Sequence, residues 1–481
     1  MAGAFIQQQL LMSKITDQWK WQLSLSLVMT LLFSCRTYNG AITHYYGAIS
    51  QGRFDEASGQ LDQNKFLKAG RNRLLFYMEK GKTTFLQGHY QESNRYFNAA
   101  DSLLVSGGRN KMWDQALGLV TNPAMQEYRG EDFEKLLIHY YKSINYMQLN
   151  MMEDATVEAR RISLSGYELN DRKKNKENKY ASDAFSMIIQ GVVYESGGDI
   201  NNAFIAYRNA ADIFLRQPDK TYYGIPLPLQ LQDDLLRTAS LLGFSQELQY
   251  YEKQFGRNYQ PVPDKDGGEV LVFWENGLAP VKAEANFFFT LTERGPGNFV
   301  FTDPDNTFFI PFDFGLFSRD SCHQLRKHFD AFRIAFPKYV EQPLYYTGAS
   351  IQRDSSYTLL LEKVEDVNQL AFRTLKERFL KEMGLALTRL TLKKLAEQQV
   401  KNENEALGEA LNLLNVLTEK ADTRNWQSLP HTIYYTRVPL KKGPNKITLT
   451  LQGQPTPQQV VFNVTGDGRL QTIHYSSLQK S

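Results

Sequence analysis

A repeated spacing of small and large residues constrains this chain more than any other feature of its sequence. Glycines and alanines let helix axes approach closely, while aromatic and aliphatic residues fill the space between helical turns. The spacing therefore predicts pairs of antiparallel helices. The clearest copies are Gly191-x-x-Tyr194-x-x-x-Gly198-x-Ile200-x-x-Ala203-x-x-x-Tyr207-x-x-Ala210, and Gly81 followed by Gly88-x-Tyr90-x-x-Ser93-x-x-x-Phe97-x-x-Ala100.

Weaker copies near Gly52 and Tyr146 extend the pattern over the first half of the chain. One helix pair cannot bury its own apolar face, so neighbouring pairs must stack. The pattern resembles the tetratricopeptide repeat; the alternative is an irregular helical bundle that uses the same packing rules. The chain is expected to leave the first helix at Gly198, with this glycine in a left-handed conformation. The packing residues are Gly81, Gly88, Tyr90, Phe97, Ala100, Gly191, Tyr194, Gly198, Ala203, Tyr207 and Ala210.

The composition of the chain changes after Gly268, where short apolar or alternating runs indicate strands. Helical spacing returns near 366–420, and strands follow to the end of the chain. We therefore predict an α+β fold, in which an N-terminal α-helical repeat domain precedes a mixed β-sandwich-like domain with a helical insert. The predicted segments are 1–35 for a signal peptide with its cysteine, 36–257 for the repeats, 258–268 for a linker and 269–481 for the mixed domain.

A cysteine at the end of a short apolar run marks the N-terminal segment. The run Leu23–Phe33 follows Lys14 and Lys20, and it is much shorter than the roughly 20 residues that a membrane-spanning helix needs. The sequence Leu32-Phe33-Ser34-Cys35 resembles a bacterial lipoprotein signal peptide. This resemblance implies that Cys35 is lipidated and anchors the mature chain. The alternative is a buried N-terminal helix with a chance cysteine.

Four segments outside the N-terminus carry a more specific resemblance. They are similar to segments of a family of bacterial envelope lipoproteins with tetratricopeptide-like repeats and a C-terminal β-containing domain. The resemblance covers most of the mature chain and brings no catalytic residues with it. The segments are Arg73–Gly81, Gly130–Glu134 together with His139–Tyr141, Glu158–Arg161 and Ala421–Trp426.

Composition and motifs exclude several kinds of chemistry. A net charge of only +3 indicates no strong field for nucleic acid or another polyanion. The chain has no GxxxxGK[ST] phosphate loop, GxSxG elbow or dinucleotide fingerprint. Cys322, His323 and His328 are the one local cluster of metal-ligand types, and their spacing does not place three ligands on one helix face. We expect no metal and no cofactor.

Two places are candidates for recognition. Arg160 and Arg161 follow Glu158 at a predicted helix end, where cations also suit the helix dipole. Asp422, Arg424 and Trp426 lie between the last helix and the next strand, where the alternative is a helix-to-strand corner anchored by the tryptophan. Carboxylate pairs such as Glu131/Glu134 and Asp233/Asp234 are expected to be solvated or ion-paired.

These observations favour a non-enzymatic envelope lipoprotein whose repeats bind a peptide or a partner protein along a concave surface. An envelope enzyme acting on cell-wall polymer is an alternative, and it predicts a pocket with two facing ionisable residues between the two halves. A purely structural spacer is another. Arg36, rather than Asp, follows the lipidation site, so we expect attachment to the outer membrane on its periplasmic side.

Overall fold

The computed structural model describes residues 37–106, 123–172, 183–261, 266–294, 299–305, 307–312, 332–354, 357–403, 420–453 and 456–478. The chain divides into two compact units, Met1–Thr43 and His44–Ser481. All contacts described below lie within the second unit. The predicted signal peptide, Cys35, and the cluster of Cys322, His323 and His328 lie outside the described residues.

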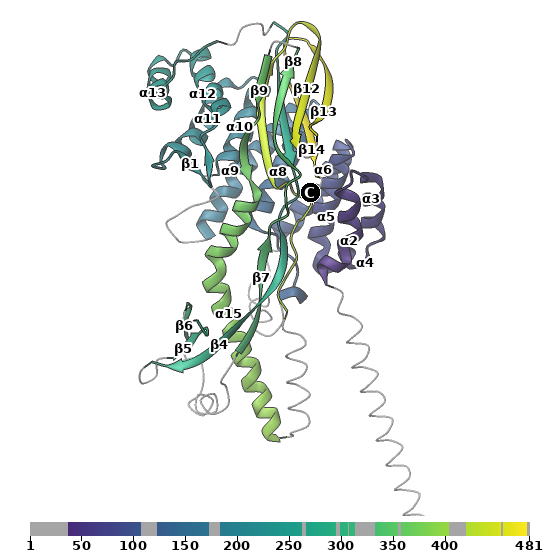
Figure 1. The fold of residues 1–481 in the computed structure, drawn as a ribbon, viewed down its shortest axis with the longest axis vertical. Helices are drawn as coiled ribbons and strands as arrows, with labels where there is room; N and C mark the ends of the chain where they lie inside the picture. Colours follow the sequence, from purple (N-terminus) through teal and green to yellow (C-terminus); the bar gives the residue numbers. More distant parts are fainter. Residues whose placement is uncertain are drawn as a thin grey trace, which may run out of the picture. The chain divides into compact units, whose positions relative to one another are not determined.

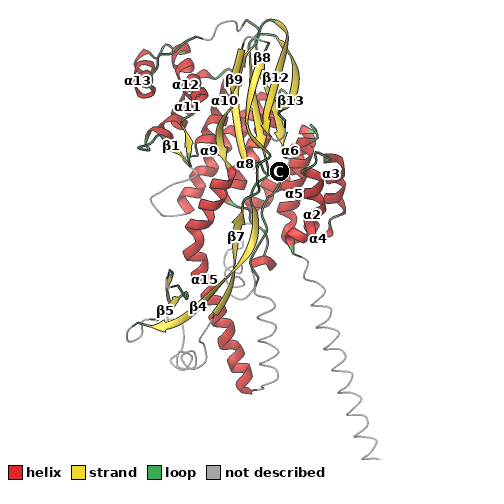
Figure 2. Cartoon of the chain, viewed as in Figure 1, coloured by secondary structure: helices red, strands yellow, loops and turns green. Residues whose placement is uncertain are grey.

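Helical pairs occupy the first half of the described chain (Figures 1 and 2). In each pair a residue with positive φ stands between the two helices, and it is Gly52 (70°), Gly88 (77°), Asn150 (57°), Gly198 (81°) and Gly243 (68°) in turn. Gly198 thus has the left-handed conformation expected of it. The pairs are α2 (Tyr38–Ile49) with α3 (Phe54–Gln63), α5 (Arg73–Leu86) with α6 (Tyr90–Ser106), α8 (Asp132–Gln148) with α9 (Met152–Arg172), α10 (Ala184–Ser196) with α11 (Ile200–Leu215), and α12 (Leu229–Leu241) with α13 (Ser245–Phe255). A short helix, α4 (Lys65–Lys68), joins α3 to α5.

The two glycines that open the repeat signatures lie where the helices of a pair touch. A Cβ atom on Gly81 would lie 2.7 Å from the Phe97 ring, and one on Gly191 would overlap the Tyr207 ring. Only glycine leaves room for these rings at this separation of the helix axes. Ala100, Ala203 and Ala210 are fully buried, Tyr90 and Tyr194 are half-buried, and Gly88 closes the α5–α6 turn.

Two four-stranded sheets follow the helices. The first has the order β10-β11-β3-β14 and the second β13-β12-β8-β9. Strand β14 pairs with β3 in parallel, and the other pairings are antiparallel. Their bounds are β3 Glu269–Asn276, β8 Tyr346–Arg353, β9 Tyr357–Leu360, β10 Glu362–Asp366, β11 Thr432–Pro439, β12 Gly443–Gly453, β13 Gln458–Gly466 and β14 Leu470–Ser477.

The strands β3 and β11 are buried on both faces. Alternate residues of β3, such as Val272 and Trp274, pack with Ile447 and Leu449 of β12 in a core between the two sheets. The intervening residues point the other way, and Phe273 packs against Tyr140 of α8 with ring centroids 6.4 Å apart. Because side chains alternate along a strand, one sheet can form a core with the second sheet and another with the helices.

A third sheet and a long helix complete the described chain. The sheet order is β6-β5-β4-β7, with β4 Val281–Glu293, β5 Phe299–Thr302, β6 Phe309–Phe312 and β7 Phe332–Val340. Helix α15 (Val367–Glu403) packs against β6 and β7. Residues 404–419 of the predicted insert lie outside the described residues. A small ribbon of β1 (Thr221–Tyr222) and β2 (Ile225–Pro226) follows α11.

The α+β layout agrees with the prediction. Strand β7, however, was not among the predicted strands. Pro337 interrupts the apolar run of β7, and a proline within a run argues against a strand. Because β7 is an edge strand of its sheet, the proline there costs no ladder hydrogen bond. The predicted boundaries at 257, 268 and 269 stay predictions, because residues 262–265 lie outside the described residues.

Candidate functional site

One face of the first helices of the pairs is covered by strands of the same chain. Glu275 of β3 is fully buried against α5 and α8, where it forms an ion pair with Lys82 and accepts a hydrogen bond from Tyr141 at 2.7 Å. His474 of β14 lies 3.2 Å from the same carboxylate. Burial disfavours ionisation of Glu275, yet Lys82 and His474 outweigh it and hold the pKa of Glu275 well below its usual range.

A second buried charge cluster joins β11 to α10 and α12. Arg437 contacts Glu195 at 2.8 Å and Asp234 at 3.0 Å, and Arg237 pairs with the same two carboxylates. Tyr435 donates a hydrogen bond to Asp234 at 2.7 Å. Burial opposes ionisation of Glu195, but the two guanidinium groups outweigh it and lower its pKa to about 2. Asp234 is therefore ion-paired, as expected, and this pairing ties the sheet to the helices.

The segment from Ala421 to Leu429 has no helix or strand and packs against the helices. Arg424 donates hydrogen bonds to Asn72 Oδ1 at 2.9 Å, to the carbonyl of Gln126 at 3.0 Å and to the carbonyl of Pro123 at 3.1 Å. The Trp426 backbone N–H donates to Glu134 at 2.7 Å. The Trp426 ring is fully buried, with its centroid 5.8 Å from those of Phe97 and Tyr141.

These contacts correct the recognition role that the sequence allowed for this segment. Arg424 and Trp426 are buried, so neither side chain is on a surface that a partner could reach. Asp422 pairs with Arg424 at 2.7 Å and also lines a pocket described below. The alternative, a corner anchored by the tryptophan, describes what this segment does. The face of the first helices that contacts β3, β11 and residues 421–429 is therefore covered, in the described region, by the chain itself.

Two buried glutamates hold the backbone of this segment. Glu79 of α5 accepts hydrogen bonds from Tyr45, Tyr46, Ser428 and the Gln427 N–H. Burial raises the pKa of Glu79 to about 7, and burial together with the nearby Glu131 raises that of Glu134 to about 7.

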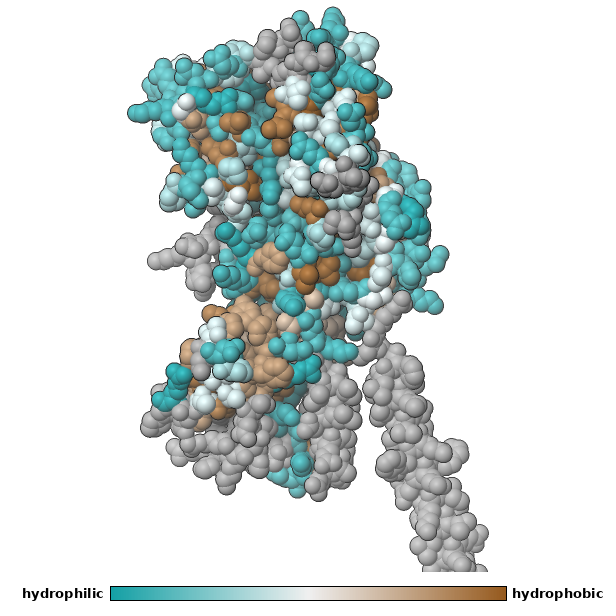
Figure 3. All heavy atoms as spheres, in the orientation of Figure 1, coloured by the Kyte–Doolittle hydropathy of each residue, from teal (hydrophilic) through white to brown (hydrophobic). Residues whose placement is uncertain are grey.

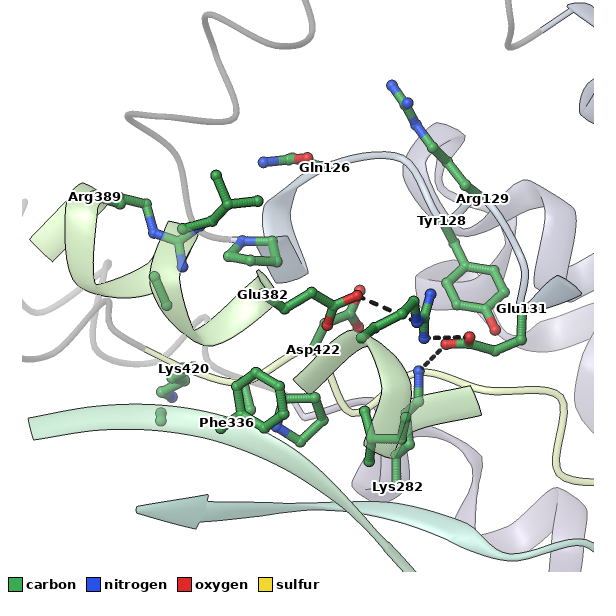
Figure 4. Close-up of a pocket in the computed structure, with 18 of the residues that line it drawn as sticks. Gln126, Tyr128, Arg129, Glu131, Lys282, Phe336, Glu382, Arg389, Lys420 and Asp422 are labelled. Atoms are coloured by element: carbon green, nitrogen blue, oxygen red, sulfur yellow. Dashed lines mark hydrogen bonds and ion pairs between the residues drawn. The ribbon is translucent and has the colours of Figure 1, made fainter. Parts of the chain in front are cut away.

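A pocket of about 370 Å³ opens where the helices, the paired strands β4 and β7, and α15 meet (Figure 4). We call it the junction pocket. Phe336 and Pro337 of β7 and Leu375 and Leu385 of α15 give it an apolar side. Its charged lining residues are Glu127, Arg129, Glu131, Lys282, Arg378, Glu382, Arg389, Lys420 and Asp422.

Glu131 is the centre of the charges in the junction pocket. It forms an ion pair with Lys282 of β4 and another with Arg378 of α15 at 2.5 Å, and Arg378 also reaches Glu382 at 3.3 Å (Figure 4). Burial disfavours ionisation of Glu131, but Lys282 and Arg378 prevail and lower its pKa. Burial raises the pKa of Glu382. The pocket thus holds two carboxyl groups whose environments shift their pKa values in opposite directions.

The other candidate residues lie apart from this pocket. Arg160 and Arg161 are exposed on α9, and Arg161 pairs with Asp101 of α6 at 2.6 Å. Glu158 is buried and contacts Lys142 and His139, each at 2.8 Å. Among the described residues, no group of three His, Cys, Asp or Glu side chains could hold a metal ion. No helix in the described part of the chain is long and apolar enough to cross a membrane.

The residues that build the junction were only partly visible in the sequence. Glu131 and Glu134 were expected to be solvated or ion-paired, and both are buried, the first in ion pairs and the second in hydrogen bonds. The sequence did not predict the ion pair of Glu275 with Lys82, because two charged residues far apart in the chain can be recognised as partners only in the folded structure. Three of the four segments singled out in the sequence analysis contain residues of this junction, namely Glu79, Glu131, Glu134, Tyr141, Asp422, Arg424 and Trp426.

No protein-family model matches this chain, and no curated protein matches it. Solved structures match part of it. MamA is 16% identical over 43% of this chain and 90% of its own, with a TM-score of 0.26. A Podosopora anserina putative kinesin light chain with nearly identical TPR-like repeats is 16% identical over 44% of this chain and 92% of its own, with a TM-score of 0.31. BtubC from P. vanneervenii is 13% identical over 44% and 75%, with a TM-score of 0.29. Likenesses at such low scores carry no functional argument.

Proposed function

We propose that this protein is a membrane-anchored lipoprotein of the bacterial cell envelope and that it acts as a protein- or peptide-binding scaffold. The observation that carries the proposal is the junction pocket, which combines apolar and charged walls from three parts of the chain. Its volume of about 370 Å³ suits a few side chains of a polypeptide. The face of the first helices is covered by the chain's own strands, so the partner binds at the junction pocket instead.

Apolar surface around the junction pocket supports a protein partner. Leu385 lines the pocket and is 50% exposed, and Leu380, five residues before it on α15, is 60% exposed. Phe288 on the neighbouring strand β4 is 53% exposed. Figure 3 shows apolar residues gathered over α15 and the paired strands β4 and β7 in this view. Exposed apolar residues that adjoin a polar pocket are typical of protein-binding surfaces.

The binding proposal is tested with the full chain and two matched variants. Leu385→Arg places a charge in the apolar wall of the junction pocket, and Leu241→Arg places one at an exposed site on α12. Affinity capture from detergent-solubilised envelopes should lose the wild-type partners with Leu385→Arg and keep them with Leu241→Arg. Identical partner sets for both variants would refute the pocket as the binding site.

The membrane anchor rests on the resemblance of the Cys35 segment to a lipoprotein signal, and we propose the outer membrane on its periplasmic side. Cys35→Ser should abolish incorporation of labelled fatty acid and release the chain from the membrane fraction. Cys322→Ser, the matched control, should retain both properties. Labelling that persists in Cys35→Ser would contradict lipidation at this residue.

A second candidate function is an enzyme that acts on cell-wall polymer. The observation that favours it is the pair of Glu131 and Glu382, whose pKa values are shifted down and up in one pocket between the helical and β segments. Such a pair can supply a base and an acid. Purified polymer should then be cleaved by the full chain and left intact by Glu382→Gln. The control variant Glu153→Gln, at an exposed position on α9, should remain active. Absence of cleavage by the wild-type chain removes this candidate.

A further inference from the structure

Strand β13 is an edge strand whose outer side pairs with no other strand of the described chain, and near its end the Thr465 carbonyl accepts a hydrogen bond from the Gln471 side chain at 2.8 Å. It ends the sheet order β13-β12-β8-β9, as Figure 1 shows, and pairs with β12 alone. The pairing runs without a bulge from Gln458 opposite Leu451 to Gly466 opposite Gly443. Within the described part of the chain, no helix or further strand pairs with its outer side.

The other long edge strands carry the features that prevent pairing with another chain. Strand β10 is interrupted by a register shift between Lys363 and Glu365. Strand β7 contains Pro337 and Lys338 within its length. On β14, the Thr472 carbonyl accepts a hydrogen bond from Gln148 of α8 at 2.9 Å. Edge strands are commonly protected by such bulges, prolines, charges and covering helices.

Strand β13 has no register shift, and its one side-chain hydrogen bond of this kind is at the Thr465 carbonyl, which accepts from Gln471 near the end of the strand. Its sequence, Gln-Gln-Val-Val-Phe-Asn-Val-Thr-Gly, contains no charged residue and no proline over nine residues. Val460, Phe462 and Val464 are half-buried and pack against the core between the two sheets. Val461, which points the other way, is 47% exposed. A long, regular, uncharged edge is a template for another strand.

The side-chain pattern of β13 is close to symmetric about Phe462. An antiparallel copy centred on this residue would place Val460 opposite Val464, and Phe462 opposite Phe462. On the outer face, Gln459 would lie opposite Thr465. Val461 would lie opposite Asn463 on that face. On the inner face apolar residues would meet apolar residues, and no like charges would meet, which favours antiparallel pairing. With the two-fold axis at Phe462, all nine residues of β13 would take part in the pairing of the two copies.

We propose that the β13 strands of two copies of this chain pair antiparallel about Phe462 and join their four-stranded sheets into one continuous sheet. The dimer would have two-fold symmetry, in which each copy supplies the same strand. The three half-buried residues would lose further exposure to water, and the open N–H and C=O groups would gain partners. The proposal is independent of the junction pocket, because no residue of β13 lines it.

The test uses the full chain in density-matched detergent and sedimentation equilibrium. Gln459 and Thr465 are exposed, so charges there leave the fold intact. In Gln459→Lys/Thr465→Lys, two pairs of lysines would face each other across the two-fold axis. Gln459→Glu/Thr465→Glu places glutamates at the same positions. The wild-type chain should be a dimer, and each charged variant should dissociate at concentrations on the order of tenfold higher or more.

An equimolar mixture of the lysine and glutamate variants should restore the dimer, because opposite charges then meet. The conservative variant Gln459→Asn/Thr465→Ser should remain dimeric. Circular dichroism spectra identical to wild type would show that the charged variants are folded. A monomeric wild-type chain, dimeric charged variants, or a mixture that stays monomeric would each overturn the proposal. Capture of a different protein through β13 by a monomeric chain would also overturn it, in favour of a foreign strand as the occupant.

Discussion

At Gly191 the ring of Tyr207 occupies the space that any side chain would need. The same relation holds between Gly81 and Phe97, with a distance of 2.7 Å from the missing Cβ atom. These contacts are local in sequence, and for that reason a spacing of residues could predict them. The glycine costs chain entropy in a helix, and the ring that fills its place offsets this cost through packing.

Gly191→Ala should destabilise the protein by about 1–3 kcal/mol, because the new methyl group forces the Tyr207 ring or the helix axes to move. Gly59→Ala is the matched control in helix α3, where no atom lies within 4 Å of the added Cβ. It should stabilise by about 0.5–1 kcal/mol. Urea unfolding midpoints measure both changes. Equal shifts in the two variants would contradict the packing role of Gly191.

The buried carboxyls predict how stability depends on pH. The pKa of Glu79 is raised from 4.5 to about 7, so the folded protein holds a proton that the unfolded chain releases between these values. The free energy of unfolding should therefore fall as pH rises from 5 to 7, with Glu134 acting in the same direction. Glu195 has a pKa lowered to about 2, so its ionised form stabilises the fold at neutral pH. This contribution is lost only as the pH falls below this range.

Glu79→Gln tests this pH dependence, because the amide keeps the neutral form at every pH. The slope of unfolding free energy against pH between 5 and 7 should become shallower, by up to roughly 1.4 kcal/mol per pH unit. Urea titrations at several pH values measure the slope. Exposed Glu153→Gln on α9 should leave it unchanged. A slope that is the same in Glu79→Gln and wild type would show that Glu79 ionises normally.

At the scale of elements, local signals predicted the helix pairs and most strands, and failed where structure depends on distant partners. The helix turns have positive φ at a glycine or an asparagine, which a sequence can reveal. Burial of β3 on both faces could not be foreseen beyond its apolar run, because Glu275 finds Lys82 across 193 positions of the chain. The sequence allowed either a recognition site or an anchored corner around Arg424, and the burial of Arg424 and Trp426 decides for the corner.

Trp426→Ala should weaken the hold of the helices on this segment. Loss of the buried indole costs about 3–5 kcal/mol, since Phe97 and Tyr141 lose their contact with it. Limited trypsin digestion should then cleave after Arg424, which is buried in the wild-type chain. Tyr250→Ala, at a 54% exposed site on α13, should leave the digestion pattern unchanged. Continued protection of Arg424 in Trp426→Ala would contradict the anchoring role.

At the scale of the whole molecule, the described helices and sheets of residues 44–481 share buried charges in addition to aromatic contacts. Lys82 with Glu275 and Arg437 with Glu195 are buried pairs, and removing one partner of such a pair typically costs about 3–5 kcal/mol. A repeat domain with an open groove would expose these side chains. The junction pocket was not predictable for the same reason, because its walls come from segments as distant as Glu131 and Glu382.

The central claim is that the chain's own strands fill the face of its first helices, so that helices and sheets unfold together. Equilibrium urea unfolding of the full chain measures this directly. Far-ultraviolet circular dichroism reports the helices, and fluorescence reports the five tryptophans of the chain, of which Trp274 and Trp426 are fully buried. We predict coincident transitions with one midpoint, and a joint shift of both probes in Lys82→Met. Two separate midpoints, or a Lys82→Met variant that shifts the circular dichroism transition alone, would contradict the claim.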